Sequence, residues 1–316
     1  MLRTERKYIE ILRILKEHQE PMGAKRLSEL MAERGFVLSD RAVQYYLRYL
    51  DDMGFTEKVG NMGRILTDYG ISETESALVG DRIGFIISKL ERLAFRSTFS
   101  PGTMTGDVAY NLSIVPKDRI DEVREIYDRV IAARCGFFSS YRILDSDPRV
   151  PSGHTGIMTI CSITMDGIFQ RKGIPVRMAF GGRLSLKNNE PERFTDLIGY
   201  RGTTIDPLQL FISAGLTSLS DVVTSGSGIA LANVREVPAS AEEKVKETID
   251  QMQGCGFVFP VMMGTKVFNL AYNPYRLSIV SFSGMNFIAI TVEKGIPIKT
   301  EIGAGNVPFS KIMSVN

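Results

Sequence analysis

The four residues Lys172–Pro175 read KGIP, and the same four residues return at Lys294–Pro297, 122 residues further along a chain of 316. A glycine with a proline shortly after it is typical of a helix end, because the glycine closes the helix in the left-handed conformation and the proline cannot continue it. We therefore interpret KGIP as a helix end that the chain makes twice. Its spacing predicts that two parts of the chain share one structural plan.

The same shift of 122 residues aligns much more of the sequence without a gap. The matched residues lie at expected turns, caps and core positions, and include Gly106 with Gly228, Asn111 with Asn233, Val123 with Val245, Phe137 with Phe259 and Ile157 with Ile279. Each part reads as a strand (108–115; 229–237), a helix (117–133; 240–252), a strand, a further strand (157–164; 277–282), a short helix and a last strand. This alternation predicts an α/β domain with an internal duplication, its related halves lying at about 96–182 and 218–304.

Length and composition narrow the class of protein. A chain of 316 residues predicts more than one domain. Hydrophobic residues make up 44% and the net charge is +2, as in a globular protein whose overall charge neither demands nor excludes a nucleic-acid partner. The longest apolar stretches are too short to cross a membrane, and no apolar signal segment follows the charged N-terminus, so we expect a cytoplasmic protein.

Residue types that serve catalysis or metal binding are scarce. The chain has three cysteines and two histidines, with no CxxC pair, HExxH motif or Cys/His cluster. It also lacks the GxSxG motif of hydrolases and the GxxxxGK[ST] motif of P-loop proteins. We expect neither an enzyme nor a protein that needs a metal or cofactor.

The first seventy residues carry a different pattern. Apolar residues at helical spacing predict three short helices, the second at 24–33 and the third at 40–53 behind the capping residue Ser39. Two short β-type runs at 55–59 and 64–67 enclose a Gly/Asn turn and predict a hairpin. Three helices and a hairpin are the order of a winged helix-turn-helix, so we predict a DNA-binding domain at 1–70. A helix at 73–95 is expected to join it to the duplicated domain, and we assign 71–316 to the latter.

A winged helix places its third helix in the major groove and its hairpin against the DNA backbone. Arginine and glutamine can form paired hydrogen bonds with guanine and adenine, while lysine and asparagine on a hairpin suit phosphate. We expect DNA to be contacted by Ser39, Arg41, Gln44, Tyr45, Arg48, Lys58, Asn61 and Arg64. Residues 1–70 hold twelve Lys/Arg and eleven Asp/Glu, which is only weakly basic, so a winged helix that contacts proteins alone stays an alternative.

Segments that differ between the halves are the candidates for ligand binding, because the shared residues serve the common scaffold. The stretch 151–156 reads PSGHTG, whereas its counterpart 273–278 reads NPYRLS and has no glycine. Exposed backbone N–H groups, a hydroxyl and an imidazole suit a carboxylate or phosphate, although a structural role for His154 is equally open. The stretches GGR (181–183), YRGTTIDP (200–207) and TSGSG (224–228) offer similar groups, and Thr204 or Asp206 is expected to cap a helix at 207–214.

We therefore expect a small anion to bind in a cleft between the halves, since clefts between related units often hold ligands. The expected contacts are Gly153, His154, Thr155, Gly156, Gly182, Arg183, Arg201, Thr203, Thr204 and Ser225. No nucleophile–base pair accompanies these residues, so the expected chemistry is binding rather than conversion.

The sequence resembles the NrpR family, the nitrogen-regulatory transcriptional repressors of methane-producing archaea and their relatives. The resemblance covers essentially the whole chain and is carried by the winged helix, by GHTG and by the stretches FGGRLSL, ERFTDLIGYRGTTIDPLQLFI and SGSGIALANVREVP. It implies a repressor that binds operators of nitrogen-assimilation genes as a homodimer or higher oligomer. It also implies that 71–316 binds the effector 2-oxoglutarate and dimerises, and that this effector weakens DNA binding.

Some members of that family carry two tandem regulatory domains, whereas one follows the winged helix here. That difference leaves room for a partner protein built only of regulatory domains. Two other functions stay open from the residues alone. One is a metabolite-binding protein or enzyme that acts on a small carboxylate, and the other is a regulatory adaptor that contacts other transcription factors.

Overall fold

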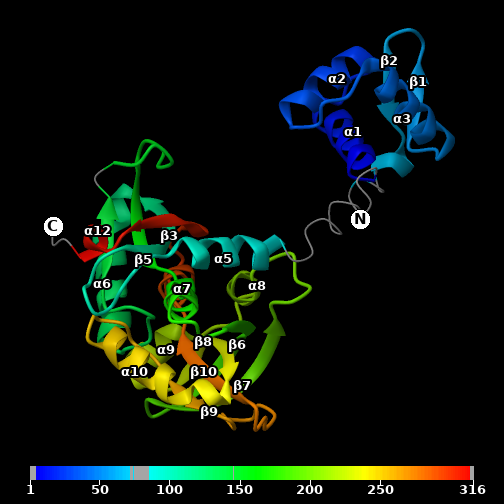
Figure 1. Cartoon of the computed structure of the whole chain (residues 1–316). Helices are drawn as coiled ribbons and strands as arrows, with labels where there is room; N and C mark the ends of the chain where they lie inside the picture. Colours follow the sequence, from blue (N-terminus) through cyan, green and yellow to red (C-terminus); the bar gives the residue numbers. More distant parts are fainter. Residues whose placement is uncertain (1–4, 72–73, 75–84, 145, 314–316) are drawn as a thin grey trace. The chain divides into compact units, whose positions relative to one another are not determined.

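The computed structural model describes residues 5–71, 74, 85–144 and 146–313 (Figure 1). The chain forms two compact units, Met1–Ile83 and Gly84–Asn316. Most of the first part of the helix expected at 73–95 lies outside the described residues, and its remainder is α5 (Phe85–Arg96). The domain boundary predicted after residue 70 stays a prediction, because the residues beyond it are largely outside the described part.

The first unit is a winged helix-turn-helix, as the sequence predicts. Its apolar helix faces meet in one core that includes Ile11, Leu27, Met31, Val43 and Leu47. The Ser39 hydroxyl accepts a hydrogen bond from the Ala42 N–H at 3.3 Å and so caps the third helix. The elements are α1 (Glu5–His18), α2 (Ala24–Glu33), α3 (Asp40–Asp52) and a hairpin of β1 (Thr56–Val59) with β2 (Gly63–Leu66).

The second unit contains two antiparallel sheets. The four-stranded sheet has the order β11-β3-β5-β4, with strands β3 (Asp107–Pro116), β4 (Tyr141–Leu144), β5 (His154–Ile160) and β11 (Lys299–Pro308). The five-stranded sheet has the order β7-β6-β8-β10-β9, with strands β6 (Arg177–Lys187), β7 (Glu190–Gly199), β8 (Gly228–Pro238), β9 (Met262–Gly264) and β10 (Arg276–Phe282). Apart from the additional edge strand β7, the two orders correspond strand for strand under the 122-residue shift.

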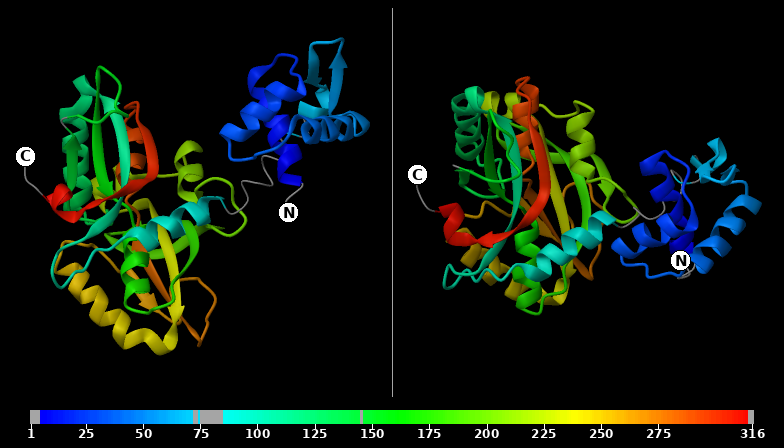
Figure 2. Two further views of the ribbon diagram at one scale, coloured as in Figure 1. Left: turned by 45° about the horizontal axis from the view of Figure 1, so that its top comes forward. Right: turned by 90° about the horizontal axis from the view of Figure 1, so that it is seen from above.

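The halves exchange their last strands. The strand that ends the first half, β6, pairs with β8 of the second half, whereas β11, which ends the second half, pairs with β3 of the first. In Figure 2 the red β11 accordingly runs beside β3, although the two come from opposite ends of the unit. Each exchange passes through a KGIP sequence, where Gly173 (φ 73°) and Gly295 (φ 69°) end a helix in the left-handed conformation, as predicted.

The two helices that lead to the exchanged strands, α7 (Ile163–Arg171) and α11 (Asn286–Glu293), are buried along most of their length. The strand expected at 157–164 begins and ends earlier than predicted. It is β5, which ends at Ile160, and residues 163–164 already belong to α7. An apolar run of this length does not by itself distinguish a strand from a buried helix.

Matched side chains fasten these two helices to the central strands. The Thr164 hydroxyl lies 3.0 Å from the N–H of Ala109 and 3.2 Å from its carbonyl oxygen. Its counterpart Asn286 accepts from the N–H of Leu231 at 2.8 Å and donates to the same residue's carbonyl at 3.0 Å. Buried backbone groups are costly when unpaired, so these bonds hold each helix at a fixed position on its strand.

The helix α5 packs against both α7 and β11. A Cβ added to Gly167 of α7 would lie 2.5 Å from the Ala94 carbonyl oxygen, which shows how closely the two helices approach. Lys89 donates to the Ile302 carbonyl at 2.6 Å, and Asn306 donates to the Leu93 carbonyl at 3.2 Å. The first described turns after the first unit thus pack against, and hydrogen-bond to, the centre of the second unit.

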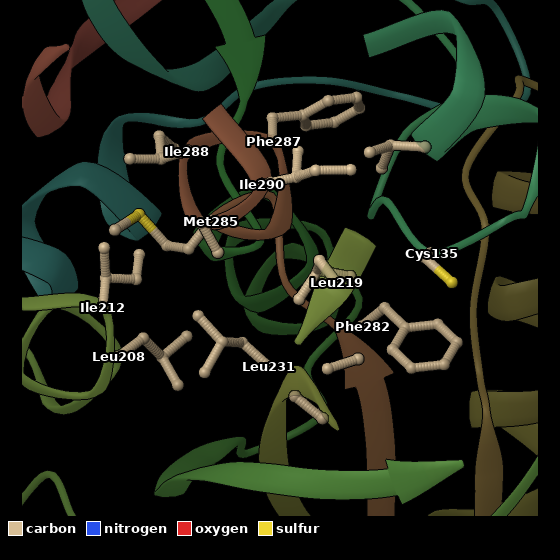
Figure 3. Packing of buried hydrophobic residues seen from close by; sticks show 14 of the residues in the cluster. Cys135, Leu208, Ile212, Leu219, Leu231, Phe282, Met285, Phe287, Ile288 and Ile290 are labelled. Carbon is tan, nitrogen blue, oxygen red and sulfur yellow. The ribbon is translucent and has the colours of Figure 1, made fainter. Parts of the chain in front are cut away.

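The remaining helices cover the sheets and complete the core. They are α6 (Ile120–Ala132), α8 (Pro207–Ser213), α9 (Leu219–Ser225), α10 (Glu242–Gln253) and α12 (Phe309–Met313), with short 3-10 helices at Lys117–Arg119 and Ala239–Ala241 before α6 and α10. Figure 3 shows Leu208 of α8, Leu231 of β8 and Met285, which directly precedes α11, meeting in the larger apolar cluster. Among the described residues, no helix is long and apolar enough to span a membrane.

Replacing Thr164 by valine should lower the free energy of unfolding by about 1–3 kcal/mol, because the change keeps the side-chain shape but leaves the buried Ala109 N–H without its partner. Urea unfolding of the two proteins measures the difference. Thr224→Val is the matched control, since that threonine is exposed and its loss should cost less than about 0.5 kcal/mol. Equal losses for both variants would contradict the role given to Thr164.

Candidate functional site

The outer face of α3 presents the side chains expected to read DNA. Arg41, Gln44, Tyr45 and Arg48 are exposed, whereas Val43, Leu47 and Leu50 of the same helix are buried. Exposed and buried residues alternate in this way because residues three or four apart in the sequence lie on the same face of a helix. Seven-residue spacing between Arg41 and Arg48 places both arginines on the same exposed side, about two turns apart.

The wing is exposed at its tip and anchored at its base. Lys58 and Asn61 are exposed, as a phosphate contact requires. Arg64 lies at the base of the wing, where its Nε is 2.7 Å from Asp51 Oδ2 and its side chain is only 19% exposed. Its backbone also exchanges two 3.0 Å hydrogen bonds with Met22. Arg64 therefore holds the wing to α3 and to the α1–α2 connection, and its contact with phosphate stays a prediction.

The stretch expected to form an anion-binding loop, Gly153–Gly156, is mostly strand. His154, Thr155 and Gly156 begin β5 and pair in register with Pro116, Val115 and Ile114 of β3. Gly156 is needed for packing, since an added Cβ would lie 2.9 Å from Val150 Cγ2. The prediction of an open loop with unpaired N–H groups is wrong, because these glycines serve a turn and a close contact within the sheet.

Gly182 and Arg183 belong to β6 of the five-stranded sheet, and Ser225 belongs to α9. All three take part in contacts within the fold. Arg183 donates to the Leu216 carbonyl at 2.6 Å and to Asp196 at 2.5 Å, and a Cβ on Gly182 would lie 2.6 Å from Leu197 Cδ2. Ser225 ends α9. Because the C-terminal end of a helix repels anions, the predicted role of Ser225 in binding one is physically unfavourable.

The segment after β7 is closer to a cavity. Asp206, and not Thr204, caps α8 by accepting from the N–H groups of Leu208 (2.9 Å) and Gln209 (3.4 Å). The Thr203 hydroxyl donates to the Tyr200 carbonyl at 3.0 Å, and Thr204 is half-buried. Of the ten residues expected to bind the anion, Arg201 is the one that lines the larger cavity of this region. The ten residues are thus spread over two sheets, the segment between β7 and α8, and the end of α9, and they do not form a single site.

A small polar pocket lies where the two halves meet. Its volume is about 20 Å³, and eight of its lining residues form pairs related by the 122-residue shift: Asn111 with Asn233, Cys161 with Ser283, Ser162 with Gly284, and Ile163 with Met285. The pocket therefore lies on the axis that relates the halves, and we call it the axial pocket. The N-terminal ends of α7 and α11 both reach it, through Ser162 and Ile163 and through Gly284 and Met285.

A buried arginine breaks the symmetry of the axial pocket. Arg235 is 1% exposed, and its counterpart in the first half is Ser113. Its Nε lies 3.1 Å from Asp166 Oδ1 of α7, and its Nη2 donates to the Ser162 hydroxyl at 3.1 Å. The third nitrogen, Nη1, is buried and has no hydrogen-bond partner in the part of the chain that the structure describes. Burial raises the pKa of Asp166, and the positive charge of Arg235 opposes that rise.

Tyr200 and Asp206 complete this polar cluster. The Tyr200 hydroxyl donates to Asn233 Oδ1 at 2.9 Å and lies 3.5 Å from Asp206 Oδ2. Burial holds the pKa of Tyr200 well above its usual value, so the phenol keeps its proton and acts as a donor. Sequence reasoning missed Arg235, although a single arginine within the apolar strand sequence LANVREV was a usable signal.

A second cavity of about 430 Å³ adjoins the axial pocket. The two share Ile163 and Met178 in their linings, and α5 contributes to both, through Leu90 on one side and through Ile87, Glu91 and Ala94 on the other. Asp166, the partner of Arg235, also lines the larger cavity. The buried charge pair thus forms part of the wall between them.

The buried thiols of Cys135 and Cys161 are poorly suited to act as nucleophiles. Burial raises the pKa of the Cys135 thiol, and likewise that of the Cys161 thiol, to about 11, so both keep their protons at neutral pH. Among the residues that the structure describes, no group of three His, Cys, Asp or Glu side chains is placed to hold a metal ion.

Comparison with known proteins gives two family matches. Residues 83–314 match a family described as NrpR regulatory domains NRD1 and 2, and residues 9–74 match the ribonuclease R winged-helix domain. The chain is 40% identical over 304 residues to the global nitrogen regulator NrpRI of Methanosarcina mazei, covering 94% of each chain.

Longer relatives match over part of their length. The chain is 30% identical to the global nitrogen regulator NrpR of Methanococcus maripaludis and 31% identical to that of Methanocaldococcus jannaschii, and it spans 51% and 52% of these two proteins. Among solved structures, a nitrogen repressor-like protein from Methanococcus jannaschii is similar, with a TM-score of 0.62 and 26% identity over 72% of this chain and 96% of the other.

Proposed function

Because the chain belongs to the NrpR family of nitrogen regulators, we propose that it is a repressor of nitrogen-assimilation genes whose binding to operator DNA is weakened by 2-oxoglutarate. The family is regulatory rather than enzymatic, and the chain joins a winged helix to that family's regulatory domain. The observation that carries the proposal is the exposed face of α3, where Arg41, Gln44 and Arg48 stand above a buried apolar face.

DNA recognition divides between α3 and the wing. Arg41, Gln44 and Arg48 can reach base edges in the major groove, where arginine pairs with guanine and glutamine with adenine. Lys58 and Asn61 at the wing contact phosphates, which contribute affinity without reading sequence. Arg64 supports the wing from below through Asp51. This division explains how a domain of nearly neutral net charge can still bind DNA through a local basic surface.

Regulation requires the effector to favour a state that binds DNA poorly. The shift cannot exceed the difference between the effector's affinities for the two states, a coupling that is typically about 1–3 kcal/mol. A homodimer provides such a state, because the spacing of two winged helices must match two half-sites on the DNA helix. The dicarboxylate 2-oxoglutarate suits this regulatory domain, whose buried centre offers a guanidinium and hydroxyl groups.

The purified chain should retard DNA fragments from upstream of glutamine-synthetase-type genes in a gel-shift assay, and millimolar 2-oxoglutarate should release them. Release is expected because the effector and the operator each bind a different state of the protein more tightly, so the effector draws the protein away from the state that binds DNA. Glutamate at the same concentration and an unrelated DNA fragment serve as controls. A protein that retards none of these upstream fragments would refute the proposed repressor.

Arg41→Ala or Arg48→Ala should each weaken operator binding by about 1–3 kcal/mol and relax base preference, because each removes a base-edge contact. Lys58→Ala should weaken binding to all sequences alike and reduce the slope of log affinity against log salt by about 1. Fluorescence anisotropy at several salt concentrations measures both effects. Arg124→Ala, an exposed arginine of α6, is the charge-matched control. If Arg124→Ala weakened binding as much as the α3 changes, α3 would not be the reading helix.

A further inference from the structure

We propose that the axial pocket binds a carboxylate group of the effector, between Arg235 Nη1 and the N-terminal ends of α7 and α11. This proposal rests on the effector-controlled repressor described above and gives its effector a site. The site is not the one that the glycine-containing stretches suggested, and it lies on the axis between the halves.

The first argument is the state of Arg235. Its Nε and Nη2 are paired with Asp166 and Ser162, whereas Nη1 has no partner among the described residues although the side chain is almost completely buried. A buried donor of a charged group is expensive to leave unpaired, and native proteins do so rarely. A ligand carboxylate is the natural partner, because guanidinium and carboxylate form short, charge-assisted hydrogen bonds.

The second argument is the convergence of two helix ends. The first N–H groups of α7 and α11 bond to the turns that precede the helices, as Thr164 N–H does to the Cys161 carbonyl and Asn286 N–H to the Ser283 carbonyl. Each helix still adds a partial positive charge at that end. Both ends line the axial pocket because the duplication places them symmetrically about its axis. Asp166 and Asp206 also face Arg235, so an added anion needs these two helix ends to offset the acidic groups.

The third argument is the asymmetry of the pocket. Residues shared by the halves, such as Asn111 and Asn233, form the common scaffold, but Arg235 and Tyr200 have no equivalents in the first half. The hydroxyl groups of Ser162, Ser283 and Tyr200 line the pocket around the charge, and each already makes at least one hydrogen bond within the protein, so a 2-oxo dicarboxylate would use their remaining donor or acceptor capacity. The pair of Arg235 with Asp166 would rarely stabilise the core more than apolar side chains of similar size, so stability alone does not account for the added arginine.

The size of the pocket links binding to regulation. A volume of about 20 Å³ holds little more than one water molecule, so a carboxylate requires one wall to move. Most of the walls are central strands and buried helices, whereas Leu90 belongs to α5, which also borders the 430 Å³ cavity. Displacing α5 would join the two spaces. It would also move the helix from which the chain continues towards the first unit.

The test is isothermal titration of the full chain with 2-oxoglutarate, succinate and glutamate. The decisive variant is the double change Arg235→Met with Asp166→Leu, which removes both buried charges together and so avoids leaving one unpaired. It should unfold cooperatively near the wild-type temperature and bind the acid at least about 30-fold more weakly. Ser162→Ala, a milder change, should weaken binding about fivefold. Arg183→Gln, in the other part of the five-stranded sheet, should bind as the wild type does.

The possible outcomes distinguish a failure of the proposed site from a failure of the proposed function. A folded double variant that still binds within threefold of wild type, or that loses operator binding without any ligand, would overturn the site. If that variant still bound operator and still released it with 2-oxoglutarate, the site would be wrong while the repressor stood. If wild type bound none of the three acids, the site and the effector part of the proposed function would both fail. Operator binding that 2-oxoglutarate no longer reverses in the double variant is the result expected.

Discussion

Each half of the regulatory unit completes its sheet with a strand from the other half. Because β6 pairs with β8 and β11 with β3, neither sheet satisfies its backbone hydrogen bonds unless both halves are folded together. The connecting helices must therefore pass through the interior, where Thr164 and Asn286 fix them to the central strands. This interlocking determines where the polar groups of the unit are buried.

The interlocking also explains the location of the polar centre. Two helices that cross the interior in symmetric positions bring their N-terminal ends to one axis, and that end of a helix favours negative charge. The second half adds Arg235 there, paired with Asp166 across the junction. A buried ion pair rarely stabilises a protein more than apolar side chains of similar size would, so the presence of Arg235 in the second half, where the first half has Ser113, is better explained by binding than by stability.

Local patterns in the sequence predicted much of the fold. Apolar spacing and the Ser39 cap identified the winged helix, and KGIP revealed the duplication because both copies end a helix in the same way. The exchange of strands could not be read from the sequence, since alternating elements indicate their type but not their partners. Glycine content misled the search for the ligand site, because Gly156 and Gly182 serve close packing. Arg235 went unnoticed because its partner Asp166 is 69 residues away in the chain.

Hydrogen–deuterium exchange of the full chain, with and without 2-oxoglutarate, tests the central claim that an effector at the junction of the halves acts through α5. The account predicts that exchange changes in α5 (Phe85–Arg96) and in the first turns of α7 and α11, with little change in β4 and β9 at the sheet edges. Changes confined to residues 153–156 and to the surroundings of Arg183, with α5 unaltered while DNA is released, would contradict it.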